Sequence, residues 1–138
     1  MKRIMIVGLV FLLGCSTGYN KKGLKGGYSE TQVDSNVYEV TFIGNGYTSM
    51  ERASDFNLLR CAELTLGNGY NYFVVKNQGD RSNQTYMMNN YGGNTAMIHR
   101  INKPGFTRYI EMHNEKPDGM SYNAVYVSKN IKDKYSIR

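Results

Sequence analysis

The stretch GNGYTSMERASDFNLLRCAELTLGNGYNYFVV, residues 44–75, decides the fold. A segment of helical length lies in it between two copies of the tetrapeptide Gly-Asn-Gly-Tyr, at residues 44–47 and 67–70. Glycine and asparagine tolerate the backbone conformations that turns require, so each copy predicts a break between two elements. Aromatic and branched residues follow the second copy at 72–75 and predict a strand.

The segment between the two tetrapeptides carries the start and stop signals of an α-helix. Thr48 or Ser49 is the expected N-cap, and Glu51 lies at the capping-box spacing from Thr48. We expect the helix to run to about Leu66 and to stop at Gly67. Small and apolar residues recur along one side at the spacing i, i+3, i+4, i+7, which predicts a buried stripe of Leu58, Cys61, Ala62 and Thr65.

A strand is predicted on each side of this helix. Residues 37–43 alternate, with Tyr38, Val40 and Phe42 on one face, as in a half-buried strand. Residues 70–76 form the second strand, and their apolar run indicates burial on both faces and a central position. The order strand, helix, strand fits either a right-handed crossover or a helix laid across an antiparallel sheet.

Residues 77–94 have no hydrophobic period and are rich in asparagine, glycine and glutamine. They predict a long loop, and loops of this length in a small domain are usually functional or disordered. An apolar cluster lies within this loop: Tyr86, Met87, Met88 and Tyr91. Two roles are open for the cluster, which are a contact surface for a partner and a lid folded back on the core.

The last third of the chain predicts a hairpin and a closing helix. Residues 95–101 and 106–113 form two strands around a turn at 103–105, which contains proline and glycine. Residues 122–132 fit a helix capped by Ser121, although an alternating strand fits part of them. The expected fold is therefore α+β, a single small two-layer domain with a β-α-β core, a β-hairpin and a C-terminal helix.

The N-terminus has the layout of a secretory signal. Lys2 and Arg3 precede ten apolar residues, Ile4 to Leu13, and the small residue Gly14 follows. A membrane-spanning helix needs about 20 apolar residues, so this run predicts a cleaved signal peptide over residues 1–14 and not a membrane anchor.

The end of this segment, Leu-Leu-Gly-Cys at residues 12–15, resembles the lipobox of bacterial lipoproteins. The resemblance implies that a diacylglycerol is joined to the Cys15 thiol and that the chain is cut before it. Two or more acyl chains anchor a protein stably to a bilayer. An ordinary cysteine that pairs with Cys61 is the alternative. Ser16, at the following position, resembles the default for the outer membrane in diderm bacteria.

Three segments are expected on this reading. They are a signal peptide at 1–14, a lipidated N-terminus with a flexible tether at 15–36, and a globular domain at 37–138. The tether is rich in glycine, lysine and small polar residues and has no apolar period. Its last part, residues 27–31, can already belong to the domain.

Motifs along most of the mature chain resemble a family of small bacterial envelope lipoproteins. These motifs are GGYSET (26–31), GNGYTS (44–49), RCAELT (60–65) and GYNYF (69–73), with KPG (103–105) and SYNA (121–124) in the tail. The family pattern is a lipobox, a G-Y-S-x-T box, and an R-x-A-E-L-T helix before G-Y-x-Y-F, followed by a closing helix. Cys61 departs from the family alanine, which agrees with a buried position. The resemblance implies an envelope lipoprotein and brings no activity with it.

Composition and spacing argue for binding and not for catalysis. Removal of Lys2 and Arg3 with the signal lowers the formal charge from +6 to +4, and nucleic acid is not an expected partner outside the cytoplasm. His99 and His113 are expected on paired strands, but their spacing does not support a metal site. The chain contains 12 tyrosines, and tyrosine suits amphipathic surfaces that bind glycan or protein.

The expected protein is a lipoprotein of the bacterial outer membrane, anchored through Cys15 on the periplasmic face. Its domain is expected to be a binding or structural module for an envelope protein or glycan. No enzyme activity, cofactor or metal is expected. The alternatives are a stress-sensing lipoprotein and a cell-envelope hydrolase, which would need a pocket that joins His99 or His113 to an acid or to Cys61.

Overall fold

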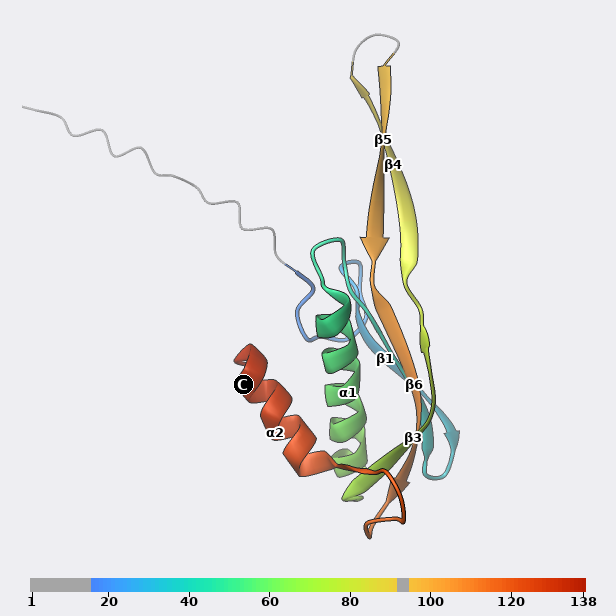
Figure 1. Cartoon of the computed structure of the whole chain (residues 1–138), viewed down its shortest axis with the longest axis vertical. Coiled ribbons are helices and arrows are strands. Elements are labelled where there is room, and N and C mark those ends of the chain that lie inside the picture. Colours follow the sequence, from blue (N-terminus) through green and yellow to red (C-terminus); the bar gives the residue numbers. More distant parts are fainter. Residues whose placement is uncertain (1–15, 92–94) are drawn as a thin grey trace, which may run out of the picture.

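The computed structural model describes residues 16–91 and 95–138, without the side chains of residues 83–100. The chain forms an α+β domain in which two helices cover one face of a five-stranded antiparallel sheet, and a separate two-stranded ladder extends from that sheet (Figure 1). The elements are β1 (Gly27–Asp34), β2 (Val37–Ile43), α1 (Met50–Gly67), β3 (Tyr72–Asp80), β4 (Asn83–Tyr91), β5 (Thr95–Lys103), β6 (Gly105–His113), β7 (Tyr122–Asn123) and α2 (Ala124–Tyr135).

The sheet has the strand order β1-β2-β6-β3-β7, and every pairing in it is antiparallel. Strand β6 therefore lies in the middle, with β2 on one side and β3 on the other. Since β2 and β3 both run antiparallel to β6, they run parallel to each other. The expected β-α-β core is confirmed in this split form. The second predicted strand, β3, is an interior strand between β6 and β7, but β6 takes the middle of the sheet and Phe73 is the one fully buried residue of β3.

Helix α1 lies across the sheet, where the sequence pattern placed it. Ser49 is its N-cap, and the Ser49 hydroxyl accepts a hydrogen bond from the Arg52 backbone N–H at 3.1 Å. The capping box predicted from Thr48 is wrong, because the Thr48 hydroxyl instead closes the preceding turn with Asn45. The helix ends at Gly67, one residue beyond the predicted last residue Leu66, and Asn68 is its C-cap.

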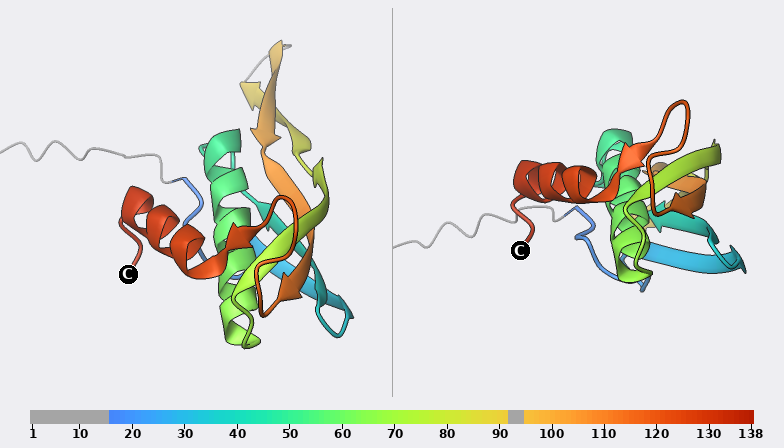
Figure 2. Two further views of the ribbon diagram at one scale, coloured as in Figure 1. Left: turned by 60° about the horizontal axis from the view of Figure 1, so that its bottom comes forward. Right: turned by 90° about the horizontal axis from the view of Figure 1, so that it is seen from below.

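The core lies between α1 and the sheet, with α2 beside α1 on the same face (Figure 2). Alternation in β2 points Val40 and Phe42 inward, and both are fully buried. The predicted helical stripe is confirmed for Cys61, Ala62 and Thr65, whose side chains are fully buried. The stripe is wider than predicted, because the helix also buries Ala53, Phe56, Asn57 and Leu59.

The predicted loop at 77–94 is wrong for the residues that the structure describes. Residues 77–80 belong to β3, and β4 follows after a two-residue break. Strand β4 pairs with β5 in register from Asn83↔Lys103 to Tyr91↔Thr95. Asparagine-rich sequence hid these strands, because it carries no hydrophobic alternation. Residues 92–94 of the predicted loop lie outside the described residues.

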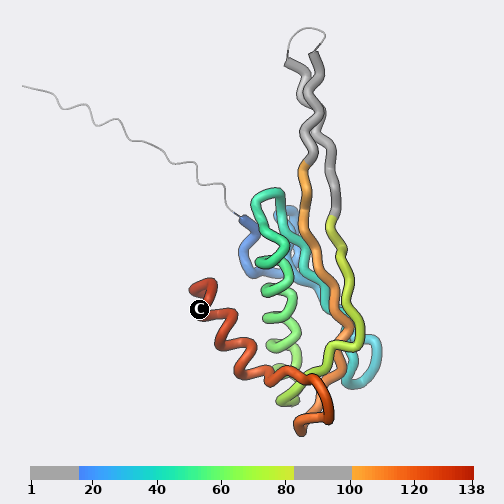
Figure 3. Tube along the Cα trace, viewed as in Figure 1, coloured from blue at the N-terminus to red at the C-terminus, as the bar shows by residue number. Residues whose placement is uncertain are grey.

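The predicted hairpin at 95–113 is also wrong. Strands β5 and β6 follow one another along the same direction, separated by Pro104 alone, and each pairs with a different partner. Pro104 has no N–H to donate, so a strand must be interrupted there. Its carbonyl accepts a hydrogen bond from the Gly44 N–H at 2.7 Å, at the point where the ladder of β2 ends. The chain trace shows residues 101–113 running on in one direction (Figure 3).

The segment predicted as a flexible tether is largely folded. Residues 27–34 form β1, paired with β2 from Gly27↔Ile43 to Asp34↔Val37. Upstream of β1, Thr17 is buried, and Tyr19 packs against Tyr28 and Phe56. Glycine and lysine content indicated a linker, but this segment is ordered by backbone pairing and by contacts distant in sequence.

The ambiguous C-terminal segment contains both predicted structures in turn. Tyr122 and Asn123 form the short strand β7 against β3, and α2 begins at Ala124. Asn123, and not the predicted Ser121, is the N-cap, since its side chain accepts from the Tyr126 N–H at 3.0 Å. In the described part of the chain, no helix has the length and apolarity that crossing a bilayer requires.

Candidate functional site

The residues predicted to carry function lie largely beyond the described side chains. Cys15, the predicted lipidation site, is outside the described residues, which begin at Ser16. The predicted contact residues lie on strand β4, but their side chains are not described: Tyr86, Met87, Met88 and Tyr91. Both roles therefore stay predictions.

Cys61 lies in the core and has the environment of an unreactive thiol. Its side chain is fully buried beside Val40, Phe73 and Ile110. The thiol donates a weak hydrogen bond to the side-chain oxygen of Asn57, with the sulfur 3.7 Å away. Burial raises the pKa of Cys61 to about 12, because a thiolate would lose its hydration there. The nucleophilic form is thus scarce at neutral pH.

The two histidines do not form the pair that the sequence predicted. His99 lies opposite Met87 in the β4–β5 ladder, whereas His113 lies opposite Tyr72 in the sheet. His113 Nε2 contacts Glu111 Oε1 at 2.9 Å. Within the described residues, no group of three or more histidine, cysteine or carboxylate side chains could hold a metal ion. The two histidines are therefore not neighbours on paired strands, and the expectation that they would be is wrong.

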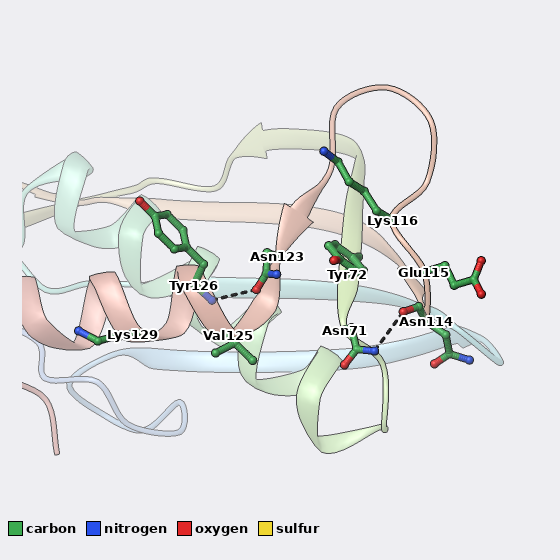
Figure 4. A pocket seen from close by; sticks show the side chains of 9 residues that line it. All are labelled: Asn71, Tyr72, Asn114, Glu115, Lys116, Asn123, Val125, Tyr126 and Lys129. Atoms are coloured by element: carbon green, nitrogen blue, oxygen red, sulfur yellow. Dashed lines mark hydrogen bonds between the residues drawn. The ribbon is translucent and has the colours of Figure 1, made fainter.

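A surface cleft of about 630 Å³ opens where β3 begins. Three segments form its walls, which are the start of β3, the turn after β6 and the first turns of α2 (Figure 4). Amide, hydroxyl and aromatic groups dominate the lining, which consists of Asn71, Tyr72, Asn114, Glu115, Lys116, Asn123, Val125, Tyr126 and Lys129.

Asn71 joins the walls of this cleft. Its backbone N–H donates to the His113 carbonyl at 3.1 Å, and its carbonyl accepts from the Ala124 N–H at 3.0 Å. Its side-chain amide donates to the Asn114 carbonyl at 3.0 Å. Asn123 holds the first turn of α2 through its capping bond. Backbone bonds of this kind fix the three walls relative to one another before any ligand arrives.

The lining offers a ligand both polar groups and apolar surface. Asparagine side chains offer both donors and acceptors, while tyrosine offers an apolar ring face with a polar end. Tyr126 remains exposed over 68 % of its surface, so its ring is available for contact. One carboxylate and two lysines, at Glu115, Lys116 and Lys129, lie at the cleft without forming a cluster of one sign.

Sequence reasoning missed this cleft. The sequence pattern assigns Asn71 and Tyr72 to a strand, and Asn123 to a segment that fits either a helix or a strand. These residues meet because β7 pairs with β3, and β7 contributes two residues to that pairing. The high tyrosine content was the one available signal, and it gives no position.

Comparison with known proteins does not extend this description, since no protein-family model, curated protein or solved structure matches the chain.

Proposed function

We propose that this chain is a lipid-anchored binding module of the bacterial envelope. Cys15 carries the lipid and holds the domain on the periplasmic face of the outer membrane. The cleft at Asn71, Tyr72 and Tyr126 takes an envelope glycan or protein segment. The protein acts by binding and not by catalysis.

The observation that carries this proposal is the position of the cleft relative to Thr17, where the N-terminal segment joins the folded domain. The chain enters next to Thr48, close to where β2 and β6 pair at Ile43↔Gly105. The cleft lies beyond the other end of β6, next to His113. A strand rises about 3.3 Å per residue, so the nine residues of β6 separate the two ends by roughly 26 Å. An anchor at the Gly105 end would leave the cleft at the far end of β6, a strand whose course is seen in Figure 1.

Two further features favour binding over catalysis. The Cys61 thiol is sealed in the core and held protonated, so it is a poor nucleophile. His113 contacts Glu111 on the sheet face opposite to the helices, remote from Cys61. A binding role needs only the preformed hydrogen-bonding and aromatic surface of the cleft.

Site-specific photo-cross-linking in cells tests the cleft. A photoreactive amino acid replaces Tyr126 in one variant and Tyr47 in the other. The two tyrosines are matched, being 68 % and 71 % exposed, but they lie at opposite ends of the domain. We expect a defined glycan or protein adduct from position 126 and not from position 47. The same adduct from both positions, or none from position 126, would refute the cleft as the binding site.

The anchor is tested separately by Cys15→Ala. Intact mass and membrane fractionation should show that the variant loses the acyl mass and leaves the membrane fraction. Retention of the variant in the outer membrane, at the level of the unaltered protein, would refute the anchor and leave the cleft proposal standing.

A further inference from the structure

The chain has almost no slack between Cys15 and the folded body. Thr17 is only 4 % exposed, and its backbone N–H donates to the Thr48 hydroxyl at 3.1 Å. Its own hydroxyl donates to the Lys25 carbonyl at 2.8 Å. Two residues of extended chain span at most about 7 Å. A lipid on Cys15 would therefore bring the surface around Thr17 close to the bilayer.

A rigid turn projects at this same surface. Asn20 and Tyr28 close its base through the Tyr28 N–H and the Asn20 carbonyl at 2.8 Å, and Gly23 and Gly26 exchange two hydrogen bonds nearer the tip. Gly26 has φ of 93°, a conformation that side chains rarely adopt. The turn places Leu24 at its tip, where that side chain is completely exposed. An aliphatic side chain without any contact, on an ordered turn, is available to enter another apolar phase.

The surroundings of Leu24 are basic. Two adjoining hollows, of about 640 and 170 Å³, contain this turn in their walls, and no acidic residue lines either of them. The lysines that line them are Lys21, Lys22, Lys25 and Lys103. Within the described chain none of these four forms an ion pair, whereas Lys76, Lys129, Lys132 and Lys134 each pair with an acid. Tyr47 also lines the larger hollow and is 71 % exposed.

We propose that this surface, formed by residues 20–26 with Tyr47 and Lys103, docks on anionic lipid headgroups. The lysines lie over the lipid phosphates, while Leu24 and the Tyr47 ring enter the boundary between headgroups and acyl chains. Basic residues beside an apolar tip are the combination that binds such an interface. The inference rests on the proposed anchor at Cys15, because that anchor brings the surface to the bilayer. Docking fixes the orientation of the domain.

The test measures immersion depth in the lipidated, full mature protein. The protein is made in a bacterial host and reconstituted into vesicles of phosphatidylethanolamine and phosphatidylglycerol. Leu24→Cys carries a nitroxide label in one sample, and Val125→Cys carries it in the control. Val125 is also an exposed apolar residue but lies at the far end, at the start of α2. Unsubstituted protein serves as the labelling blank, because the Cys61 thiol is fully buried.

We expect the label at position 24 to be shielded from a water-soluble nickel chelate and open to oxygen, with the reverse at position 125. A Lys21, Lys22 and Lys25→Gln triple variant should lose most of that shielding, since each lysine near an anionic surface contributes roughly a fivefold preference. Equal water access at positions 24 and 125, in protein whose mass includes the lipid, would overturn the docking surface and leave the anchor intact. Protein without the lipid mass would refute the anchor and the docking with it.

Discussion

Asn57→Ala should destabilise the fold far more than the loss of one ordinary hydrogen bond. Asn57 lies on α1 and is fully buried. Its amide nitrogen donates to the Val40 carbonyl at 2.7 Å and to the Phe106 carbonyl at 2.9 Å. Its oxygen accepts from Arg108 Nη1 at 2.9 Å. One side chain thus connects the helix to β2 and β6, the two strands at the middle of the core.

The magnitude follows from what alanine leaves behind. A net hydrogen bond contributes about 1 kcal/mol, and each buried group left without a partner costs about 1–3 kcal/mol. Arg108 keeps two hydrogen bonds to Ser54, at 2.9 and 3.0 Å, so its guanidinium group still has partners in the variant. The two carbonyls left short of a donor cost about 2–6 kcal/mol together, and the lost Arg108 bond adds about 1 kcal/mol, so the total is about 3–7 kcal/mol. The weak bond from the Cys61 thiol is lost as well. The total is a large fraction of the 5–15 kcal/mol that stabilises a typical domain.

Equilibrium unfolding in guanidinium chloride, followed by circular dichroism, measures this effect. The matched control is Asn68→Ala at the exposed end of α1, where the side chain donates a 2.7 Å bond to the Leu64 carbonyl and accepts a long 3.4 Å bond from the Tyr38 hydroxyl. Asn68→Ala should cost less than about 1 kcal/mol. Equal midpoints for the two variants, at unchanged denaturant slopes, would refute the role given to Asn57.

Three further predictions concern other parts of the core and its edges. Arg60→Ala should lose about 1 kcal/mol of unfolding free energy, because Arg60 pairs with Glu30 at 2.6 Å in a partly buried position. Glu30→Gln should lose less, and an unchanged unfolding free energy in both variants would contradict a stabilising ion pair. Burial raises the pKa of Cys61 to about 12, so the stability that its neutral form contributes is complete below the unfolded pKa near 8.5 and is lost as the pH rises. Between pH 9 and 11 the unaltered protein should therefore lose about 1.4 kcal/mol of unfolding free energy per pH unit more than Cys61→Ala does. Parallel plots of unfolding free energy against pH for the two proteins would contradict this prediction. Gly26→Ala should cost on the order of 2 kcal/mol of unfolding free energy in thermal melts, because a Cβ there would lie 2.2 Å from a backbone oxygen at a φ of 93°. The control Gly67→Ala has open space around it and should be neutral or stabilising. A neutral Gly26→Ala would refute the backbone strain.

The elements that the sequence predicted well are those with a strong local period. Strand β2 begins and ends at the predicted residues, since its alternation of inward Val40 and Phe42 is unbroken. Helix α1 has a cap, a stripe and a stop within one segment, so its bounds were predicted to within two residues. In both cases local signals and tertiary packing agree, which is the condition for reading structure from sequence.

The failures arose where long-range pairing overrides local composition. A Lys-Pro-Gly sequence is a good turn, but Pro104 instead interrupts two strands whose partners lie elsewhere. Strand β1 contains a run of polar residues that is ordered by its ladder with β2. Asn57 was not expected in the core, because its burial requires two carbonyls and Arg108 to meet it there. No spacing within a single segment carries that information.

The folded state of residues 17–26 also determines how the domain would respond to mechanical load. Tension applied through Cys15 would reach Thr17 first, and then the hydrogen bonds that close the turn from Asn20 to Tyr28. Beyond them, β1 is secured by its full ladder with β2. Release of residues 17–26, at no more than about 3.5 Å each, would add less than about 35 Å of reach before β1 yields. A domain docked on its membrane would thus contain a segment that unfolds, and lengthens the connection to the anchor, only when a bound partner pulls the domain outward.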